Sequence, residues 1–121
     1  MQIELLKDKF CVCKIDDVSQ ANIKSDFFFL ANTDSEVSLV CKEVDAPKDS
    51  VAVDRSWRAL RIVGTLDFSL VGILSKISTV LANAGVPIFA VSTYDTDYIL
   101  IKEERVDKAC RTLKKSGYSI I

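Results

Sequence analysis

Residues 70–101 read LVGILSKISTVLANAGVPIFAVSTYDTDYILI, and this run predicts one helix followed by one hairpin. Apolar side chains recur in its first part at steps of three and four residues, the stripe of an amphipathic helix: Leu70, Ile73, Leu74, Ile77, Val80, Leu81 and Ala84. Gly85 and Pro87 end that helix, because neither residue type continues one well. Residues 87–93 and 98–101 then predict two strands joined by the polar turn 94–97.

The flanking segments add two strands and a second helix. Residues 57–64 alternate and then become apolar, which is typical of a strand. Residues 103–116 predict a helix with acids early and bases late, in agreement with the helix dipole, and residues 118–121 predict a final strand. The order βαββαβ predicts an α+β ferredoxin-like sandwich, with both helices on one face of the sheet because each has one apolar stripe.

The first half of the chain reads as a shortened copy of the second. A shift of 61 residues sets residues 27–40 against residues 88–101 and makes Glu36 the counterpart of Asp97. Few residues separate the first-half strands, and Pro47 interrupts the segment that would carry a second helix. We therefore expect a tandem repeat with a degenerate half at 1–54 and a complete copy at 55–121.

Composition excludes several classes of function. The 121 residues hold 16 Lys+Arg, 17 Asp+Glu and no histidine, so a serine–histidine or cysteine–histidine nucleophile is absent. No basic run exceeds Lys114-Lys115, which argues against a nucleic-acid partner. No apolar run is long enough to span a membrane, and acids near Met1 are atypical of a signal peptide. We expect a cytoplasmic protein without a membrane partner.

The four cysteines, Cys11, Cys13, Cys41 and Cys110, lie in apolar stretches. Their spacing matches no paired zinc-binding or redox motif. We interpret them as small core residues in a reducing compartment, and we expect neither a metal nor a cofactor.

Several separated motifs carry a family resemblance. They read LDFSLVGIL at 66–74, AGVPI at 84–88 and STYDTDYIL at 92–100, and they resemble ACT domains. With NTDSEVSLV at 32–40 and WRAL at 57–60, the chain is similar to the tandem-ACT subgroup to which the CASTOR arginine sensors are related. The resemblance implies a regulatory module that binds a small ligand, usually an amino acid, between two ACT units, and it implies no catalysis.

The candidate ligand site follows from the same motifs. A glycine at position 72, in the first turn of the predicted helix, costs about 1 kcal/mol there, and it either opens the helix N-terminus to a carboxylate or allows close packing. Asp97 heads a strand and suits an ammonium or guanidinium group, whereas Asp67 either caps the helix or faces the ligand. The candidate site comprises Asp67, Phe68, Ser69, Gly72, Ile73, Ser92, Thr93, Tyr94 and Asp97.

Two other functions compete with this hypothesis. One is a protein–protein interaction domain without a small-molecule ligand. The other, a small enzyme of the acylphosphatase type, is disfavoured because the turn before the first helix lacks the required arginine and amide. The partners expected are an amino acid, a second copy in a homodimer, and a regulated enzyme or other protein. Glu36 could complete a second site, but the first copy lacks a matching glycine turn, so we expect that copy either not to bind a ligand or to act as a partner surface.

Overall fold

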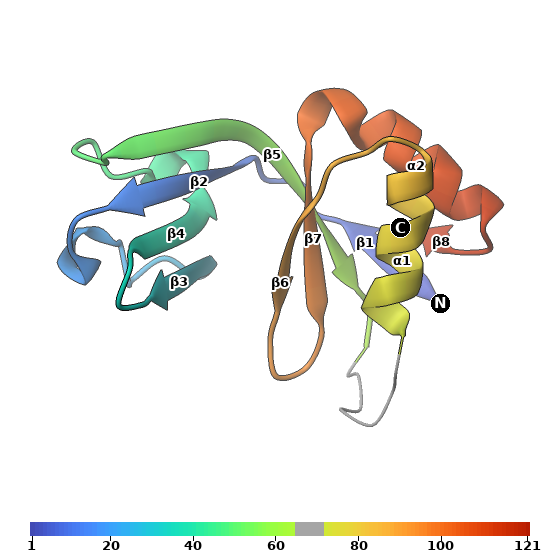
Figure 1. Ribbon diagram of the computed structural model, residues 1–121, viewed down its shortest axis with the longest axis horizontal. Helices are drawn as coiled ribbons and strands as arrows, with labels where there is room; N and C mark the ends of the chain where they lie inside the picture. Colours follow the sequence, from blue (N-terminus) through green and yellow to red (C-terminus); the bar gives the residue numbers. More distant parts are fainter. Residues whose placement is uncertain (65–71) are drawn as a thin grey trace. The chain divides into compact units, whose positions relative to one another are not determined.

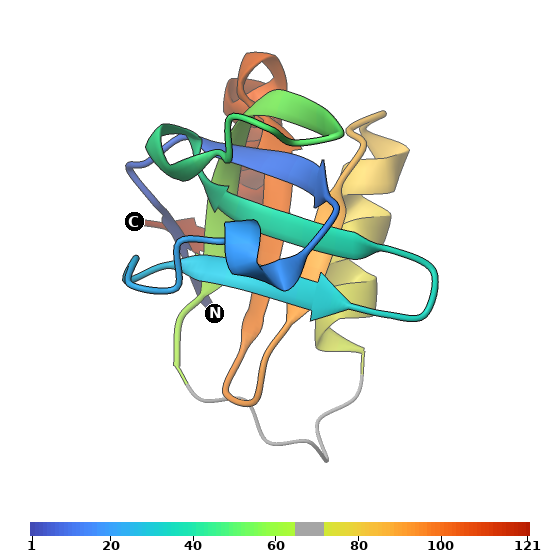
Figure 2. The ribbon, with the colours of Figure 1, turned by 90° about the vertical axis from the view of Figure 1, so that its left-hand side faces the viewer.

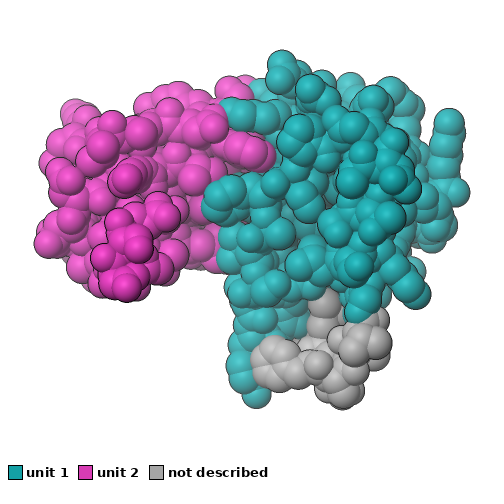
Figure 3. Space-filling view, viewed as in Figure 1, with its two compact units in different colours: residues 1–7, 58–121 teal, residues 8–57 magenta. Residues whose placement is uncertain are grey.

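The computed structural model describes residues 1–64 and 72–121, which form two compact units (Figure 1). Unit 1 comprises residues 1–7 and 58–121, and unit 2 comprises residues 8–57 (Figure 3). The strands are β1 (Gln2–Leu5), β2 (Phe10–Ile15), β3 (Phe28–Asn32), β4 (Val37–Lys42), β5 (Ala52–Ile62), β6 (Phe89–Ser92), β7 (Asp97–Lys102) and β8 (Ser119–Ile120). The helical elements are α1 (Ile73–Asn83), α2 (Val106–Lys115) and the 3₁₀ turns η1 (Val18–Gln20), η2 (Glu43–Asp45) and η3 (Glu103–Arg105).

Unit 1 is the predicted α+β ferredoxin-like sandwich. Its strands are hydrogen-bonded in the order β8-β1-β5-β7-β6, with the C-terminal part of β5 in the centre. Buried residues of both helices and of one sheet face share a single core: Ile3, Leu60, Ile62, Ile77, Leu81, Val86, Ile99, Ile101, Val106, Ala109 and Leu113. Both helices therefore cover the same face, as their single apolar stripes require. No helix of the described residues is long and apolar enough to cross a membrane.

Strand β1 adds a fifth strand that the sequence analysis did not anticipate. It lies between β8, to which it is parallel, and β5, to which it is antiparallel. Ile3, opposite Ile62 in this register, is fully buried in the core of unit 1. The first seven residues, which the sequence analysis placed with the first half, thus pack as part of unit 1.

Unit 2 has the strand order of the same fold without its helices. The N-terminal part of β5 pairs with β2, β2 with β4, and β4 with β3, all antiparallel. The two helices of a complete copy are replaced by η1 and η2, each three residues long. Asp17 is the N-cap of η1 and forms a capping box there, in which its side chain accepts a hydrogen bond of 2.8 Å from the Ser19 N–H. The first copy is therefore reduced, as predicted.

The structural repeat has a shift of 60 residues, so the predicted shift of 61 is wrong. Strands β4 and β7 begin at Val37 and Asp97, have the same burial pattern, and both run into a 3₁₀ turn. The preceding turns share one hydrogen bond, from the Thr33 N–H to the Glu36 carbonyl and from the Thr93 N–H to the Thr96 carbonyl. Val37, not Glu36, is therefore the counterpart of Asp97. The one-residue error arose because both turns are polar and were matched by composition.

A buried hydrogen bond holds the β6–β7 turn against β5. Thr96 is 7% exposed, and its hydroxyl donates to the Ile62 carbonyl at 2.7 Å. The carbonyl of Thr96 accepts from the backbone N–H and the hydroxyl of Thr93, at 2.8 and 2.9 Å. The hairpin end and the last residue of β5 are thus fixed relative to each other.

Cysteine sulfurs occupy the centre of the unit 2 core. Cys11, Cys13 and Cys41 are buried among Ile15, Ala21 and Leu39. Burial, followed by the Cys11 contact, raises the pKa of Cys13 from 9.0 to about 11. The Cys41 contact and burial raise the pKa of Cys11 further still. The folded chain therefore favours neutral thiols at these positions, in agreement with their interpretation as core residues.

We predict that Thr96→Val lowers the free energy of unfolding by about 1–3 kcal/mol, because the buried Ile62 carbonyl loses its side-chain donor. Thr96→Ser keeps the hydroxyl and should retain most of the stability. Urea unfolding followed by circular dichroism measures both variants. Equal stability of the valine and serine variants would show that this hydrogen bond is unimportant.

We also predict that the fold loses stability in alkali as Cys13 ionises. Its pKa is higher in the folded than in the unfolded chain, so the contribution is complete below pH 9 and disappears towards pH 11. At about 1.4 kcal/mol per pKa unit, the loss is on the order of 3 kcal/mol. Urea titrations across this pH range should give a shallower decline for Cys13→Ala than for the unmodified chain, and equal declines would contradict the assignment.

Candidate functional site

The predicted site residues that the structure describes lie at one end of unit 1. The β6–β7 turn and the first residues of α1 are at the same end in both views (Figures 1 and 2). The last residue of β5 reaches this end too, since Ile62 bonds to the turn through Thr96. Three elements that are separate in sequence therefore meet there. Asp67, Phe68 and Ser69 lie outside the described residues.

Asp97 and Ser92 are opposite each other where the hairpin begins. They are register partners of β7 and β6, and Asp97 is half-buried. Side chains two residues apart on a strand share a face. Because Ile99 belongs to the core beneath the helices, Asp97 and its partner Ser92 lie on the face that carries α1.

Gly72 immediately precedes α1 and is its N-cap. The prediction that it lies in the first helical turn is therefore off by one residue. The alternative in which Asp67 caps the helix concerns a residue outside the described part of the chain. Its φ of 80° is left-handed, a conformation that favours glycine. Gly72 is exposed, and an added Cβ would have no atom within 4 Å. Of the two predicted reasons for this glycine, close packing is thus excluded among the described residues.

The first backbone N–H groups of α1 precede its helical hydrogen bonds. Its first helical hydrogen bond runs from the Lys76 N–H to the Gly72 carbonyl, at 2.8 Å. The N–H groups of residues 73–75 precede that bond, and no described side chain caps the helix. Such donors, together with the positive end of the helix dipole, suit a carboxylate.

The remaining candidates divide between core and surface. Ile73 is half-buried and packs against the unit 1 core, so its side chain is accounted for by packing. Thr93 and Ser92 are exposed, and Tyr94 at the turn is 80% exposed. Thr96 was interpreted only as a turn residue, yet its buried hydroxyl positions the hairpin. The sequence held no signal for that role, because nothing local assigns the Thr96 hydroxyl to an acceptor 34 residues away.

Unit 2 offers two further features. An open hollow on the sheet is lined by charged side chains of both signs, including Lys14, Glu36, Asp54 and Arg55. In the described part of the chain, one group of potential metal ligands was found, the buried sulfurs of Cys11, Cys13 and Cys41. Neither feature resembles a set of catalytic groups.

Comparisons with solved structures agree with this architecture. A protein from Agrobacterium tumefaciens is 26% identical over 99% of this chain and 91% of its own, with a TM-score of 0.87. The ligand-free regulatory subunit of aspartate kinase from Thermus thermophilus is 13% identical, with a TM-score of 0.68 over 95% of this chain and 96% of that chain.

A third match is a larger protein. Aspartate kinase from Clostridium acetobutylicum, described as an allosteric enzyme, is 16% identical with a TM-score of 0.69. The match covers 90% of this chain but 32% of the kinase chain. At these identities the two kinase-related structures show a shared fold.

A match to a protein-family model identifies the family of this chain. The ACT domain model matches residues 52–115, which include β5, both helices and the β6–β7 hairpin. ACT domains are regulatory modules, and the Thermus match is itself a regulatory subunit. Because the match covers more than half of the chain and the strands and helices follow the expected order, this protein belongs to the ACT domain family.

Proposed function

We propose that this protein is a non-catalytic regulatory module that binds an amino acid, or a similar small ligand, at an interface between two ACT units. The observation that carries the proposal is that a helix start, which no described side chain caps, lies at the same end of unit 1 as the half-buried carboxylate of Asp97. The helix start attracts a carboxylate, and Asp97 attracts an ammonium group. Both charges of a zwitterion are thereby paired.

In this proposal the described residues have distinct roles. The backbone at Gly72 and Ile73 receives the ligand carboxylate, and Asp97 receives its cationic group. Ser92 and Thr93 add hydroxyl contacts, and exposed Tyr94 covers the ligand or meets a second ACT unit. Asp67, Phe68 and Ser69 complete the proposed site from the adjoining segment. Thr96 keeps the hairpin in place without touching the ligand.

The second ACT unit comes from another copy of the chain in this proposal. Unit 2 has valine at the position of Asp97 and a three-residue 3₁₀ turn where the complete copy has α1. It therefore lacks both charged elements of the proposed site. A cytoplasmic homodimer that regulates an enzyme or another protein is the assembly we propose, and the strand order of unit 2 supports the likeness to tandem-ACT proteins related to the CASTOR sensors.

One observation favours a protein partner in place of a small ligand. Large apolar side chains of unit 2 are exposed on and beside its 3₁₀ turns, with Ile23 at 71% and Val44 at 90% exposure. Exposed apolar residues close together are typical of interaction surfaces. The alternative function is thus a protein–protein interaction domain that uses unit 2.

A thermal-shift panel of the common amino acids tests the proposed ligand class. A ligand present at 100 times its Kd should add about 2.7 kcal/mol to the free energy of unfolding. Asp97→Asn should abolish this stabilisation, because it removes the charge that pairs the ammonium group. Asp95→Asn, in the exposed turn, is the matched control and should retain it.

A panel without any response contradicts the ligand proposal. Affinity capture of one specific protein, lost in Val44→Asp but kept in the unmodified chain, would then establish the alternative. A response that survives in Asp97→Asn would place the ligand away from the described carboxylate.

We further predict that Gly72→Ala lowers the free energy of unfolding by about 1–2 kcal/mol, since alanine is strained at a φ of 80°. Gly72→Asn should cost less, because asparagine adopts left-handed backbone more readily. Denaturant unfolding compares the two. Because no atom lies within 4 Å of an added Cβ, identical losses for both variants would contradict a purely backbone cause.

A further inference from the structure

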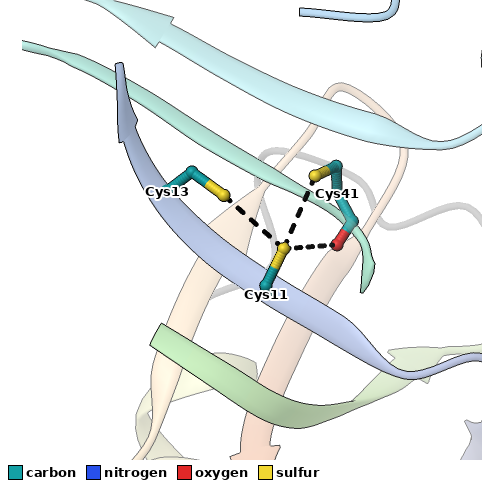
Figure 4. A group of neighbouring side chains, drawn as sticks. All are labelled: Cys11, Cys13 and Cys41. Carbon is teal, nitrogen blue, oxygen red and sulfur yellow. Dashed lines mark hydrogen bonds between the residues drawn. The ribbon is translucent and has the colours of Figure 1, made fainter. Parts of the chain in front are cut away.

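Three cysteine side chains converge inside unit 2 from two paired strands. Cys11 and Cys13 lie on β2, and Cys41 lies opposite Cys11 on β4 (Figure 4). The Cys11 sulfur is 3.5 Å from that of Cys13 and 3.6 Å from that of Cys41. All three sulfurs lie within 4.8 Å of one another, and none forms a disulfide.

This spacing matches a triangle of sulfurs around one atom. A central atom bonded to three sulfurs at about 2.3 Å, the length of a zinc–thiolate bond, separates them by up to about 4.0 Å. The two measured separations lie slightly below that value, and the third lies within 4.8 Å. Small side-chain rotations are therefore enough to bring all three sulfurs onto one atom.

The surroundings favour an adduct without charge. The three side chains are at most 1% exposed, and they pack mainly against apolar side chains such as Ile15, Leu39 and Val53. Ser50 interacts with Cys13, and the charge of Arg55 acts on Cys11. A buried charge without a partner is costly. Three thiolates around Zn²⁺ leave one negative charge, and around Cu⁺ they leave two. Three thiolates around trivalent arsenic leave none.

We propose that Cys11, Cys13 and Cys41 form a site for a trivalent thiophilic metalloid, of which arsenite is the test case. One arsenous acid, As(OH)₃, reacts with three thiols to form three As–S bonds and release three waters. Each As–O bond is replaced by an As–S bond, and each thiol proton leaves in a water. Arsenic stays trivalent, so no oxidant or reductant is needed.

In this proposal a small solute reaches the buried sulfurs when the turns beside them open. In unit 2, 3₁₀ turns stand where a complete copy has helices, and Ala21 and Ala46 end those turns beside the sulfurs. Short turns with few buried contacts open at a lower free-energy cost than packed helices. Once formed, the adduct links β2 to β4 and resists unfolding. The site uses no residue of the proposed amino-acid site in unit 1.

Native mass spectrometry of the reduced full chain with sodium arsenite tests the proposal. We expect one arsenic per chain, with the mass gain of an arsenic atom less three hydrogens. Cys110→Ala is the matched control, because Cys110 lies outside the cluster, and it should bind as the unmodified chain does. Cys41→Ala and Cys13→Ala should each lose the three-sulfur adduct, with circular dichroism confirming that they remain folded.

A second measurement avoids substitutions altogether. Arsenite should protect Cys11, Cys13 and Cys41 of the unmodified chain from slow alkylation, mapped by peptide mass, while Cys110 remains reactive. The proposal is overturned if no adduct forms, if Cys41→Ala leaves it unchanged, or if equimolar Zn²⁺ or Cu⁺ displaces the arsenic. An amino-acid response with no arsenic adduct would overturn this proposal alone, and the reverse result would overturn the ligand proposal alone.

Discussion

In each unit, the sheet has an apolar face that must be shielded from water, and the way this face is covered determines what the unit can do. In unit 1, Ile62, Ile99 and their neighbours pack under two amphipathic helices. Covering by a helix also brings a helix N-terminus to the edge of the sheet, with its free N–H groups. The proposed amino-acid site is thus a consequence of how the core is closed, with Thr96 fixing the hairpin beside it.

Unit 2 covers the apolar face of its strands with two short 3₁₀ turns in place of helices. Its two 3₁₀ turns cover less area than helices, so the side chains beneath them must be compact. Cys41 occupies the position of Ile101 in the complete copy, and with Cys11 and Cys13 it fills the centre of the core with small polarizable atoms. The sulfur cluster and the absence of a helix-based site in unit 2 therefore have one cause.

Local patterns predicted the helices, the hairpin and the reduced first copy, because periodicity and turn residues act over a few positions. They did not predict that β1 lies between β8 and β5, since that pairing joins Ile3 to Ile62 across the whole unit. Gly72 shows the same limit for the site. A glycine at this position indicated an accessible helix start. Its φ of 80° and the first helical residue, Ile73, depend on the folded chain and could not be predicted locally. The convergence of three sulfurs was likewise invisible, because Cys41 meets Cys11 only through strand register.

The repeat shift of 60 residues sharpens the difference between the two copies. With a shift of 61, Glu36 would be the counterpart of Asp97, and both hairpins would begin their second strand with an acid. With the observed shift, Val37 stands where unit 1 has Asp97, while the turn hydrogen bonds of Thr33 and Thr93 remain alike. The hairpin geometry is therefore common to both copies and the charge is not. The turn itself needs no carboxylate at that position, so Asp97 is free to take the cation-pairing role that we propose for it.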